Sequence, residues 1–290
     1  MWELILEVPS KKSVEFFERA IAEFVVGISS FEIKKSLAWQ IKGYSPFLPD
    51  RGAIASRITV ISILANVSEP KLQINCLKDI NWVEESRKFS KPISIGHFFL
   101  PGFDATVRLP TNSTVVRIEP GMAFGTGSHE TTQGCLKAID HLFPSIGPDN
   151  PLDLGTGSGI LAIALAKRYE GSVIASDNDN LAIQVACENA KKNGVLGQIK
   201  FYVTSGVENE AIRGNAPYDF LVANILARPL IELADKIVEL LMPKSTVVLS
   251  GILTEQRKEV EKVYEKNGMK VINFIDSGEW VTLVLRFRNL

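Results

Sequence analysis

The stretch of residues 151–287 alternates short apolar runs with longer amphipathic runs, and this rhythm restricts the possible folds more than any other feature. The short runs have the length of strands, whereas the apolar residues between them recur at the spacing of one helix face. Such an alternation is typical of a mainly parallel sheet covered by helices on both faces. The predicted strands are residues 152–154, 172–176, 199–203, 219–223, 246–250, 270–275 and 280–287, and the predicted helices are 159–167, 181–192, 229–241 and 254–266.

Only residues 276–279 separate the last two predicted strands. A connection this short does not allow a parallel crossover, which needs a dozen or more residues, so these two strands are expected to pair antiparallel. The sequence therefore predicts an α/β domain with a seven-stranded, Rossmann-like sheet.

Residues 1–78 follow a different pattern. The expected elements are a strand at 2–8, a helix at 14–26 with Ser13 as its N-cap, strands at 31–34 and 39–43, a helix at 51–67 and a strand at 72–77. The segment 51–67 also contains a β-branched run that suits a strand, but its apolar residues fall on one helical stripe. The order β-α-β-β-α-β predicts a smaller α+β domain of the ferredoxin-like, split-βαβ kind. A linking helix is expected at 81–89, and a β-hairpin from 105–109 and 114–118.

Composition and charge exclude several kinds of partner. The net charge is −1, so the chain has no overall attraction to nucleic acid, and we expect no direct nucleic-acid requirement. The three cysteines lie far apart without metal-ligand spacing, so no metal is expected. The chain has neither a signal-peptide pattern nor an apolar run that could span a bilayer, so we expect a cytoplasmic protein that does not contact membranes. The lack of a long apolar stripe favours a monomer.

A glycine-rich loop follows the first strand of the repeating pattern. The apolar residues 152–154 run into Gly155, Gly157 and Gly159, with Thr156 between the first two, and then into a predicted helix. Glycine is needed where a backbone turns sharply or where a ligand approaches too closely for a β-carbon. The loop therefore predicts a nucleotide-like ligand, although a tight turn without a ligand would look the same.

The next predicted strand leads to Asp177, 22 residues after Gly155. A carboxylate at this place can accept hydrogen bonds from a ribose diol, which favours the ligand-binding interpretation. Asn178 would lie beside the ligand, and Asp179 is the candidate N-cap of the following helix.

The spacing of the glycines indicates which ligand this is. Dinucleotide enzymes favour G-x-G-x-x-G, because the pyrophosphate binds at the bared helix N-terminus. Here the spacing is G-x-G-x-G, and Asp153 stands two residues before the first glycine. S-adenosylmethionine has no phosphate but carries an ammonium group, which an acidic residue near the loop would suit. The sequence thus favours S-adenosylmethionine, with S-adenosylhomocysteine as product, over the alternative of an NAD-dependent oxidoreductase.

Three segments, residues 120–132, 152–194 and 222–230, resemble the PrmA family, which methylates large-subunit ribosomal protein eleven. The most specific is F-G-T-G-S-H-E-T-T at residues 124–132. The resemblance implies a Rossmann-like catalytic domain at 101–290, a linker helix and hinge at 79–100, and a substrate-recognition domain at 1–78. It also implies that the cofactor is bound by Phe124, Gly125, Thr126, Gly127, Thr132, Gly155, Thr156, Gly157, Asp177, Asn178 and Asn224. The family often has a second tryptophan four residues after Trp82, whereas this chain has Ser86.

Asn224 ends the fourth strand of the repeating pattern, at the sheet edge where open α/β sheets bind ligands. Many amine-directed methyltransferases have N-P-P-Y here, but this chain has Asn224-Ile225-Leu226-Ala227 without the aromatic residue. The departure matches the PrmA pattern and argues against a planar amide or nucleobase as the methyl acceptor. Asn224 is the candidate catalytic residue, because it can accept a hydrogen bond from a neutral amine. His129 is the one histidine in a motif, and a hydrogen bond within its loop explains it as well as catalysis does.

The resemblance implies methylation of lysine side-chain amines of ribosomal protein eleven, free or before full ribosome assembly, with the N-terminal amine as a further candidate. A lysine methyltransferase for another protein is the nearest alternative. A non-enzymatic RNA- or ribosome-binding role is disfavoured, because the aromatic motif for base stacking is not evident at residues 31–44.

Overall fold

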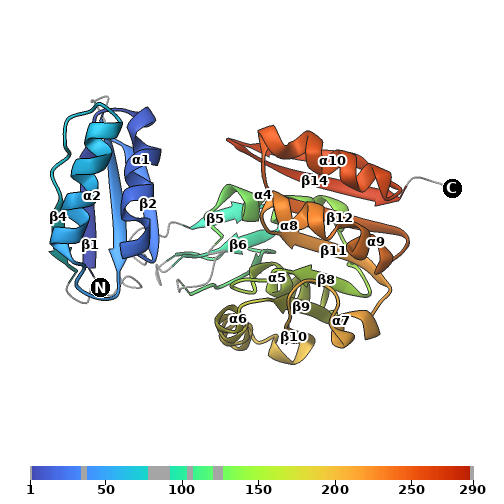
Figure 1. Cartoon of the computed structure of the whole chain (residues 1–290). Coiled ribbons are helices and arrows are strands. Elements are labelled where there is room, and N and C mark those ends of the chain that lie inside the picture. Colours follow the sequence, from blue (N-terminus) through green and yellow to red (C-terminus); the bar gives the residue numbers. More distant parts are fainter. Residues whose placement is uncertain (1, 34–37, 78–91, 103–106, 120–126, 288–290) are drawn as a thin grey trace. The chain divides into compact units, whose positions relative to one another are not determined.

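The computed structural model describes residues 2–33, 38–77, 92–102, 107–119 and 127–287. The chain divides into two compact units, Met1–Trp82 and Val83–Leu290, which are treated separately below (Figure 1). The expected linking helix at 81–89, together with Ser86, lies outside the described residues. Within the described part of the chain, no helix is long and apolar enough to cross a membrane.

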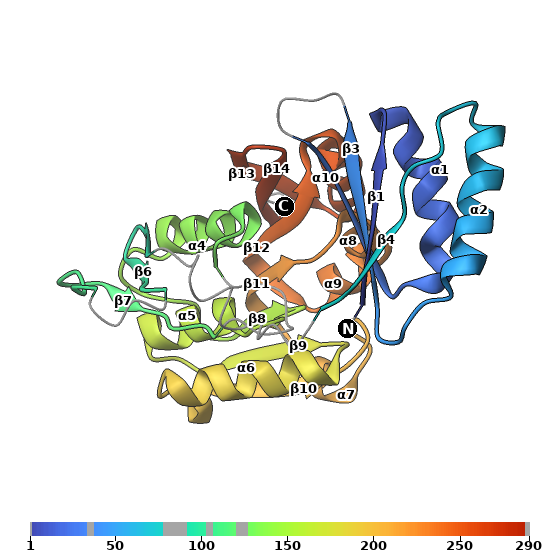
Figure 2. The same ribbon diagram turned by 90° about the vertical axis from the view of Figure 1, so that its left-hand side faces the viewer.

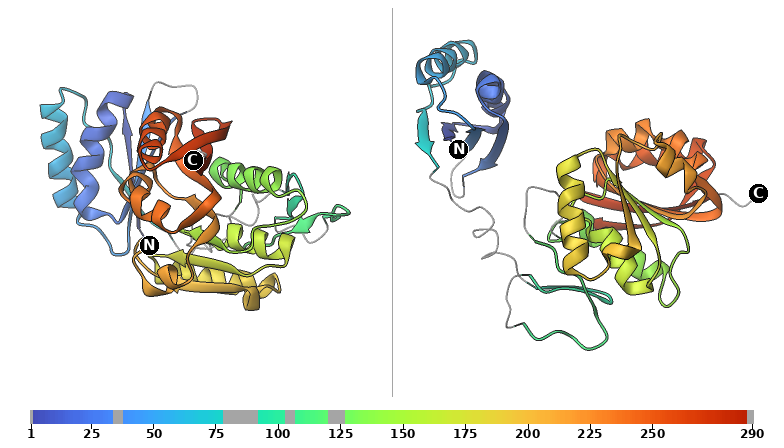
Figure 3. Two further views of the ribbon diagram at one scale, coloured as in Figure 1. Left: turned by 90° about the vertical axis from the view of Figure 1, so that its right-hand side faces the viewer. Right: turned by 90° about the horizontal axis from the view of Figure 1, so that it is seen from below.

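The first unit has the predicted order of elements. They are β1 (Trp2–Val8), α1 (Lys11–Ile21), β2 (Gly27–Glu32), β3 (Trp39–Ser45), α2 (Arg51–Leu64) and β4 (Gln73–Cys76). The strands form an antiparallel sheet in the order β2-β3-β1-β4, so that β3 is inserted between β1 and β2. This arrangement confirms the split-βαβ prediction. Both helices cover one face of the sheet (Figure 3), where Leu4, Leu6, Phe17, Ile41, Ile54 and Ile58 form the core.

Two boundaries in the first unit differ from the prediction. The first helix begins at Lys11 with Ser10 as its N-cap, so Ser13, the predicted N-cap, is a buried residue inside the helix. The second strand begins at Gly27 instead of residue 31, because the 3₁₀ turn Ala22–Phe24 ends the helical segment early. The helix predicted at 51–67 is confirmed, and the carboxylate of Asp50 caps it by accepting from the N–H groups of Gly52 and Ala53.

The second unit contains the predicted seven-stranded sheet, in the order β10-β9-β8-β11-β12-β14-β13. The strands are β8 (Pro151–Leu154), β9 (Val173–Asp177), β10 (Ile199–Val203), β11 (Tyr218–Asn224), β12 (Leu241–Leu253), β13 (Met269–Ser277) and β14 (Trp280–Phe287). The five strands β8 to β12 pair with one another only in parallel. The strand β14 runs antiparallel to both of its neighbours, β12 and β13. The Rossmann-like fold and the antiparallel last pair are thereby confirmed.

Helices cover both faces of this sheet. They are α4 (Glu130–Leu142), α5 (Ile160–Tyr169), α6 (Asn180–Lys192), α7 (Glu210–Gly214), α8 (Ala227–Glu232), α9 (Ala234–Glu239) and α10 (Arg257–Lys266). Figure 2 shows α4 and α5 on the side of the sheet away from α8 and α9. Within β11, Phe220 and Val222 face the α4–α5 side, whereas Leu221 and Ala223 face the other core. A strand buried on both faces must be apolar at every position, which explains the continuous apolar runs.

The structure contradicts the predicted hairpin at 105–109 and 114–118. Residues 107–110 form no strand, and β7 (Thr114–Val115) pairs in parallel with β6 (Phe98–Leu100), which itself pairs with β5 (Ile93–Ile95). All three residues of β6 are buried, so tertiary burial of this apolar strand outweighs the local turn signal. The helix predicted at 229–241 is also divided, into α8 and α9.

Candidate functional site

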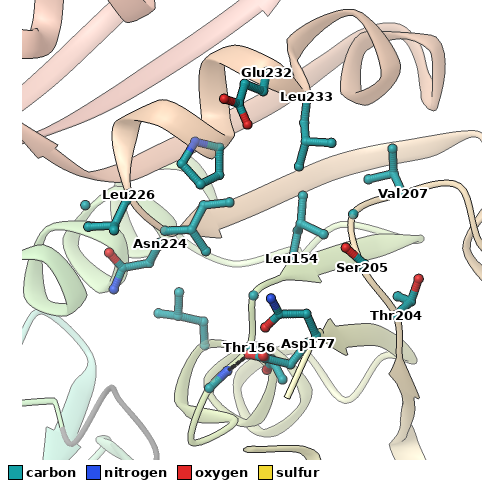
Figure 4. A pocket seen from close by; sticks show the side chains of 18 of the residues that line it. Leu154, Thr156, Asp177, Thr204, Ser205, Val207, Asn224, Leu226, Glu232 and Leu233 are labelled. Carbon is teal, nitrogen blue, oxygen red and sulfur yellow. Dashed lines mark hydrogen bonds between the residues drawn. The ribbon is translucent and has the colours of Figure 1, made fainter. Parts of the chain in front are cut away.

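The candidate site lies at the carboxyl ends of β8, β9 and β11. The strand order runs from β8 through β9 to β10 in one direction and through β11 to β12 in the other. In open α/β sheets, ligands bind where the strand order reverses in this way. A cavity of about 880 Å³ opens at this place in the structure (Figure 4). Among the described residues, those that line it belong to the second unit.

The glycine loop forms the floor of the cavity. The N–H groups of Gly155 and Thr156 both donate to the Ser176 carbonyl at 2.8 Å, which ties the loop to β9. Gly155 has φ +74°, and a β-carbon there would overlap the side chain of Ile225. Glycine at this position therefore meets both a steric and a conformational requirement. Gly155, Thr156 and Gly157 all line the cavity.

Asp153, the acidic residue near the loop that would suit an ammonium group, lies beneath the loop and is not among the residues that line the cavity. It is fully buried, and its Oδ2 accepts from Thr156 Oγ1 at 2.6 Å and from the Ala162 N–H at 3.0 Å. Among the described residues, Oδ1 has no hydrogen-bond partner. Burial raises the pKa of this carboxyl to about 7, and the hydrogen bond from Thr156 opposes that rise. Asp153 therefore holds the glycine loop from below.

Asp177 is the carboxylate that faces the cavity. Its Oδ2 accepts from the Gly157 N–H at 2.9 Å and its Oδ1 from the Asp179 N–H at 3.0 Å. A carboxylate offers about four acceptor positions, so two hydrogen bonds orient the group and leave others for hydroxyl donors. Asn178 also lines the cavity. Asp179 caps α6 as predicted, by accepting from the Leu181 N–H at 2.8 Å.

Asn224 ends β11 and lines the cavity from the other side of the switch point. Its Nδ2 donates to Thr132 Oγ1 at 3.3 Å, whereas its Oδ1 is buried without a hydrogen-bond partner among the described residues. Thr132 is itself fully buried, and its neighbour Thr131 is the residue that lines the cavity. The contact with Thr132 therefore orients the Asn224 amide.

His129 is the N-cap of α4, because its imidazole accepts from the Thr131 N–H at 3.3 Å. Its ring also packs edge-on against Trp280, with the centroids 5.1 Å apart and the planes at 68°. Both rings line the cavity. A buried hydrogen-bond network fixes the start of α4 behind them, because Ser250 Oγ contacts the Thr131 carbonyl at 3.2 Å and Thr282 Oγ1 at 2.7 Å.

Several lining residues were not predicted from the sequence. They are Trp280, the segment 204–208 after β10, and the α8–α9 residues Glu232, Leu233 and Lys236. The α8–α9 group carries no motif, so no signal in the sequence indicates it. For Trp280 a signal existed: an antiparallel last strand places its amino end at the edge where the parallel strands have their carboxyl ends.

Charged side chains rim the cavity. Glu208 pairs with Lys236 at 2.7 Å and with Arg213 at 3.1 Å, and the hydrogen bond from Lys236 is the main cause that lowers the pKa of Glu208. Exposed pairs of this kind add little stability. Within the described part of the chain, no group of three or more His, Cys, Asp or Glu side chains is arranged to hold a metal ion.

The structure describes only one of the cofactor-binding residues expected at 124–127. Phe124, Gly125 and Thr126 lie outside the described residues. Gly127 has φ +88° and packs against Leu100 and Ile160 instead of lining the cavity. Just before the undescribed stretch, the Asn193 side chain accepts from the Arg117 N–H at 3.0 Å and donates to the Arg117 carbonyl at 2.7 Å. Helix α6 thus anchors the segment that leads toward residues 120–126.

Comparisons with a family model, with curated proteins and with solved structures all point to the same family. The family model described as ribosomal protein L11 methyltransferase (PrmA) matches residues 13–288. A ribosomal protein L11 methyltransferase of Rhizobium johnstonii is 36% identical over 263 residues, which are 91% of this chain and 89% of the relative. One of Brucella suis is 41% identical over 210 residues, 72% of this chain and 74% of that one. The crystal structure of a ribosomal protein L11 methylase from Lactobacillus delbrueckii subsp. bulgaricus superimposes with a TM-score of 0.62 at 30% identity, covering 68% of this chain and 99% of the other.

Proposed function

Because the chain belongs to the ribosomal protein L11 methyltransferase (PrmA) family, we propose that it methylates lysine side-chain amines of ribosomal protein L11 with S-adenosylmethionine as donor. The observation that carries the proposal is the buried, unpartnered Oδ1 of Asn224 in the wall of the same cavity as Asp177. The amide oxygen of Asn224 suits the N–H donors of an amine, and the carboxylate of Asp177 suits the hydroxyls of a ribose. The cavity therefore has groups that could bind both an amine as methyl acceptor and a nucleoside-containing methyl donor.

The residues present fit the proposed cofactor. In Figure 4, Asn224 and Leu226 lie together at one end, whereas Thr204, Ser205 and Val207 lie at the other, with Thr156 and Asp177 along the wall. We assign the ribose to Asp177, the amino-acid end to the loop around Gly155 and Gly157, and the methyl group to the end near Asn224. The predicted contributions of Thr132, Asn178 and residues 124–127 remain part of this proposal. Bound S-adenosylmethionine would supply an electrophilic methyl group on a positively charged sulfur.

Asn224 would act on the acceptor amine. The amine must be neutral to attack, since only then does nitrogen carry a lone pair. A carbonyl oxygen that accepts one N–H turns this lone pair toward the methyl carbon. The C–N bond forms as the C–S bond breaks with its electron pair moving to sulfur, and the extra proton leaves nitrogen to water. Positive charge grows on nitrogen during the reaction, so the oriented oxygen stabilises the transition state more than the bound substrate.

The first unit is proposed to recognise the protein substrate. The described lining residues of the cavity all belong to the second unit. A folded protein substrate needs additional contact surface beyond one side chain. We further propose that the chain acts on free ribosomal protein L11 or before ribosome assembly is complete, in the cytoplasm and as a monomer, without a nucleic-acid requirement.

A transfer assay tests the proposal. The full chain is incubated with methyl-labelled S-adenosylmethionine and purified ribosomal protein L11, and the products are mapped by mass spectrometry. We expect label on lysine amines and a drop in kcat of about 100-fold for Asn224→Ala, the size seen when one polar group that stabilises a transition state is removed. Asn215→Ala, which removes the C-cap asparagine that follows α7 and does not line the cavity, is the matched control and should keep wild-type kcat.

The possible failures have different meanings. If cofactor binds but ribosomal protein L11 is not labelled while another protein is, the substrate assignment is wrong and a lysine methyltransferase for another protein remains. If Asn224→Ala and Asn215→Ala are equally active, the role given to the Asn224 carbonyl is wrong. A third variant, Thr132→Val, removes the hydrogen bond that orients the amide, and should lower kcat while Thr132→Ser restores it.

A further inference from the structure

The buried carboxyl of Asp153 lies on the same face of the sheet as Asn224. Asp153 of β8 pairs with Val222 of β11, and Asn224 stands two residues further along β11. Side chains two residues apart in a strand point to the same face and are about 7 Å apart along the strand. The carboxyl therefore lies below the end of the cavity to which the methyl group of the donor is assigned.

The contacts of Asp153 favour its protonated form. Its Oδ2 accepts from Thr156 and Ala162, but its Oδ1 has no hydrogen-bond partner among the described residues. Burying an ionised carboxylate costs far more than burying a neutral carboxyl, above all where one oxygen lacks a donor. Burial accordingly raises the pKa of Asp153 to about 7, so the carboxyl is poised to change its charge at neutral pH.

The groups that face this carboxyl supply no positive charge. Cys135 of α4 is fully buried, and burial raises the pKa of its thiol, which stays neutral. Asp177 of β9 adds a negative charge, which contributes to the raised pKa of Asp153, and no lysine or arginine of the described residues contributes to it. The other neighbours on α5, the loop and the flanking strands do not titrate: Thr156, Ala162, Ala175 and Val222. A positive charge that acts on Asp153 must come from a ligand.

The two forms of the proposed cofactor differ in charge at the reacting atom. S-adenosylmethionine has a positively charged sulfur, whereas the sulfur of S-adenosylhomocysteine is neutral. A nearby cation favours the ionised form of a carboxyl and lowers its pKa. At an effective dielectric constant of about 20, two unit charges about 10 Å apart attract strongly enough to change a binding constant by about 10-fold. A carboxyl below the loop can therefore respond to the charge of sulfur without touching the cofactor.

We propose that Asp153 makes cofactor exchange proton-linked, because it releases a proton to solvent when S-adenosylmethionine binds and takes one up again when methyl transfer leaves S-adenosylhomocysteine in the cavity. This inference rests on the proposed methyl donor and gives Asp153 a positioning role in discriminating the donor from its product. The ionised carboxylate attracts the charged donor, and the neutral carboxyl offers no such attraction to the product. Thr156 links the two, since it lines the cavity and donates to Asp153 at 2.6 Å. Affinity for the donor rises with pH through about 7 and is constant above it.

Titration calorimetry on the full chain tests the proposal, with S-adenosylmethionine and S-adenosylhomocysteine as separate ligands. Measurements in buffers with different heats of ionisation give the number of protons released on binding. A 10-fold attraction lowers the pKa of Asp153 from about 7 to about 6, so about half a proton should be released at pH 6.5. The Kd of S-adenosylmethionine should fall about fivefold between pH 6 and pH 8 through this linkage. Asp153 should release no proton on binding of S-adenosylhomocysteine.

Variants assign the proton to this carboxyl. Asp153→Asn should lose the linkage, and the difference between wild type and variant cancels the titration of the cofactor's own amino group. Asp276→Asn removes an exposed carboxylate of β13 and should behave as the wild type. Thr156→Val removes a hydrogen bond that lowers the pKa of Asp153, so the midpoint of the pH dependence should move upward even where affinity falls. Infrared difference spectra of the wild type should show a protonated carboxyl signal that disappears when S-adenosylmethionine is added.

The outcomes separate this inference from the proposed function. Equal pH dependence of donor binding in the wild type and Asp153→Asn would overturn the inference and leave the methyl donor in place. The same release of the Asp153 proton with both cofactor forms would also overturn it, because the charge on sulfur would then have no effect. If S-adenosylmethionine does not bind to the wild type at any pH, the proposed cofactor is wrong and the inference falls with it.

Discussion

The buried carboxyl of Asp153 makes the stability of the second unit depend on pH in an unusual direction. Its pKa is about 7 in the folded chain, because burial disfavours the charged form, against 3.8 for an ordinary aspartate. Between these two pH values the folded state binds a proton that the unfolded state has lost. The contribution to stability is therefore complete below about pH 4 and is lost as the pH rises toward about 7. The difference between 3.8 and about 7 corresponds to about 4 kcal/mol.

Asp153→Asn should remove this dependence. The amide does not titrate, and its oxygen can still accept from Thr156 and Ala162 as the carboxylate does. We expect the variant to match the wild type at pH 5 and to be more stable at pH 8. The gain at pH 8 relative to pH 5 should be about 3 kcal/mol, because the wild type loses about 1.4 kcal/mol for each of the two pH units between pH 5 and its pKa of about 7. An unmade hydrogen bond of the new NH₂ group would cost about 1–3 kcal/mol at both pH values and leaves this difference unchanged.

Urea unfolding between pH 5 and pH 8 measures this difference, and hydrogen exchange of the α5 amides assigns it to the second unit. Subtracting the unfolding free energy of the wild type from that of the variant at each pH removes the contribution of all other titrating groups. Asp276→Asn, which removes an exposed carboxylate of β13, is the matched control for the loss of one charge. If the wild type and Asp153→Asn lose or gain stability in parallel across this range, Asp153 is already ionised in the folded chain and the reasoning is wrong.

Three further changes test how the site is supported. Gly251→Ala should cost at least about 1–2 kcal/mol, since Gly251 has φ +80° and a β-carbon would overlap the Ile225 carbonyl. Thermal unfolding and kcat check this, and an unchanged kcat would show that the backbone beside Asn224 tolerates displacement. Tyr264→Phe should lose about 1–2 kcal/mol of stability without weaker cofactor binding, because its buried hydroxyl donates to a carbonyl of α8 at 3.1 Å. Asn193→Ala should speed hydrogen exchange at Arg117 and weaken cofactor binding; protection equal to that of the wild type would show that this anchor is dispensable.

Much of the second unit could be predicted because its signals are local. Each strand is buried on both faces and is apolar throughout, so the alternation with helices can be read without knowledge of the fold. The short connection between the last two strands determined their antiparallel pairing, and Asp179 was recognised as a cap from its position alone. The hairpin at 105–118 was predicted wrongly because the true strand pairing there is not local. The partner of β7 is β6, which comes earlier in the chain, and no turn signal indicates a parallel pairing of this kind.

The candidate site was predictable where residues follow strands directly. Gly155, Asp177 and Asn224 stand at the ends of parallel strands, and such ends meet at one edge of the sheet, so their shared place in the cavity wall followed from the order of elements. The direction of a side chain was not predictable in the same way. The sequence placed Asp153 near the loop as an acidic residue that would suit an ammonium group, but its side chain turns beneath the loop, where Thr156 and Ala162 supply its hydrogen bonds.

The sequence by itself determined the family, the strand ends that carry Asp177 and Asn224, and the kind and order of the strands in both main sheets. These depend on periodicity, on turn residues and on motifs, all of which act over a few neighbouring positions. Tertiary structure alone decided that Thr132 orients the Asn224 amide and that Trp280 packs against His129 in the wall of the same cavity. Both contacts join segments that are distant in the chain, and they arise only when β14 pairs with β12 and α4 packs across that pair.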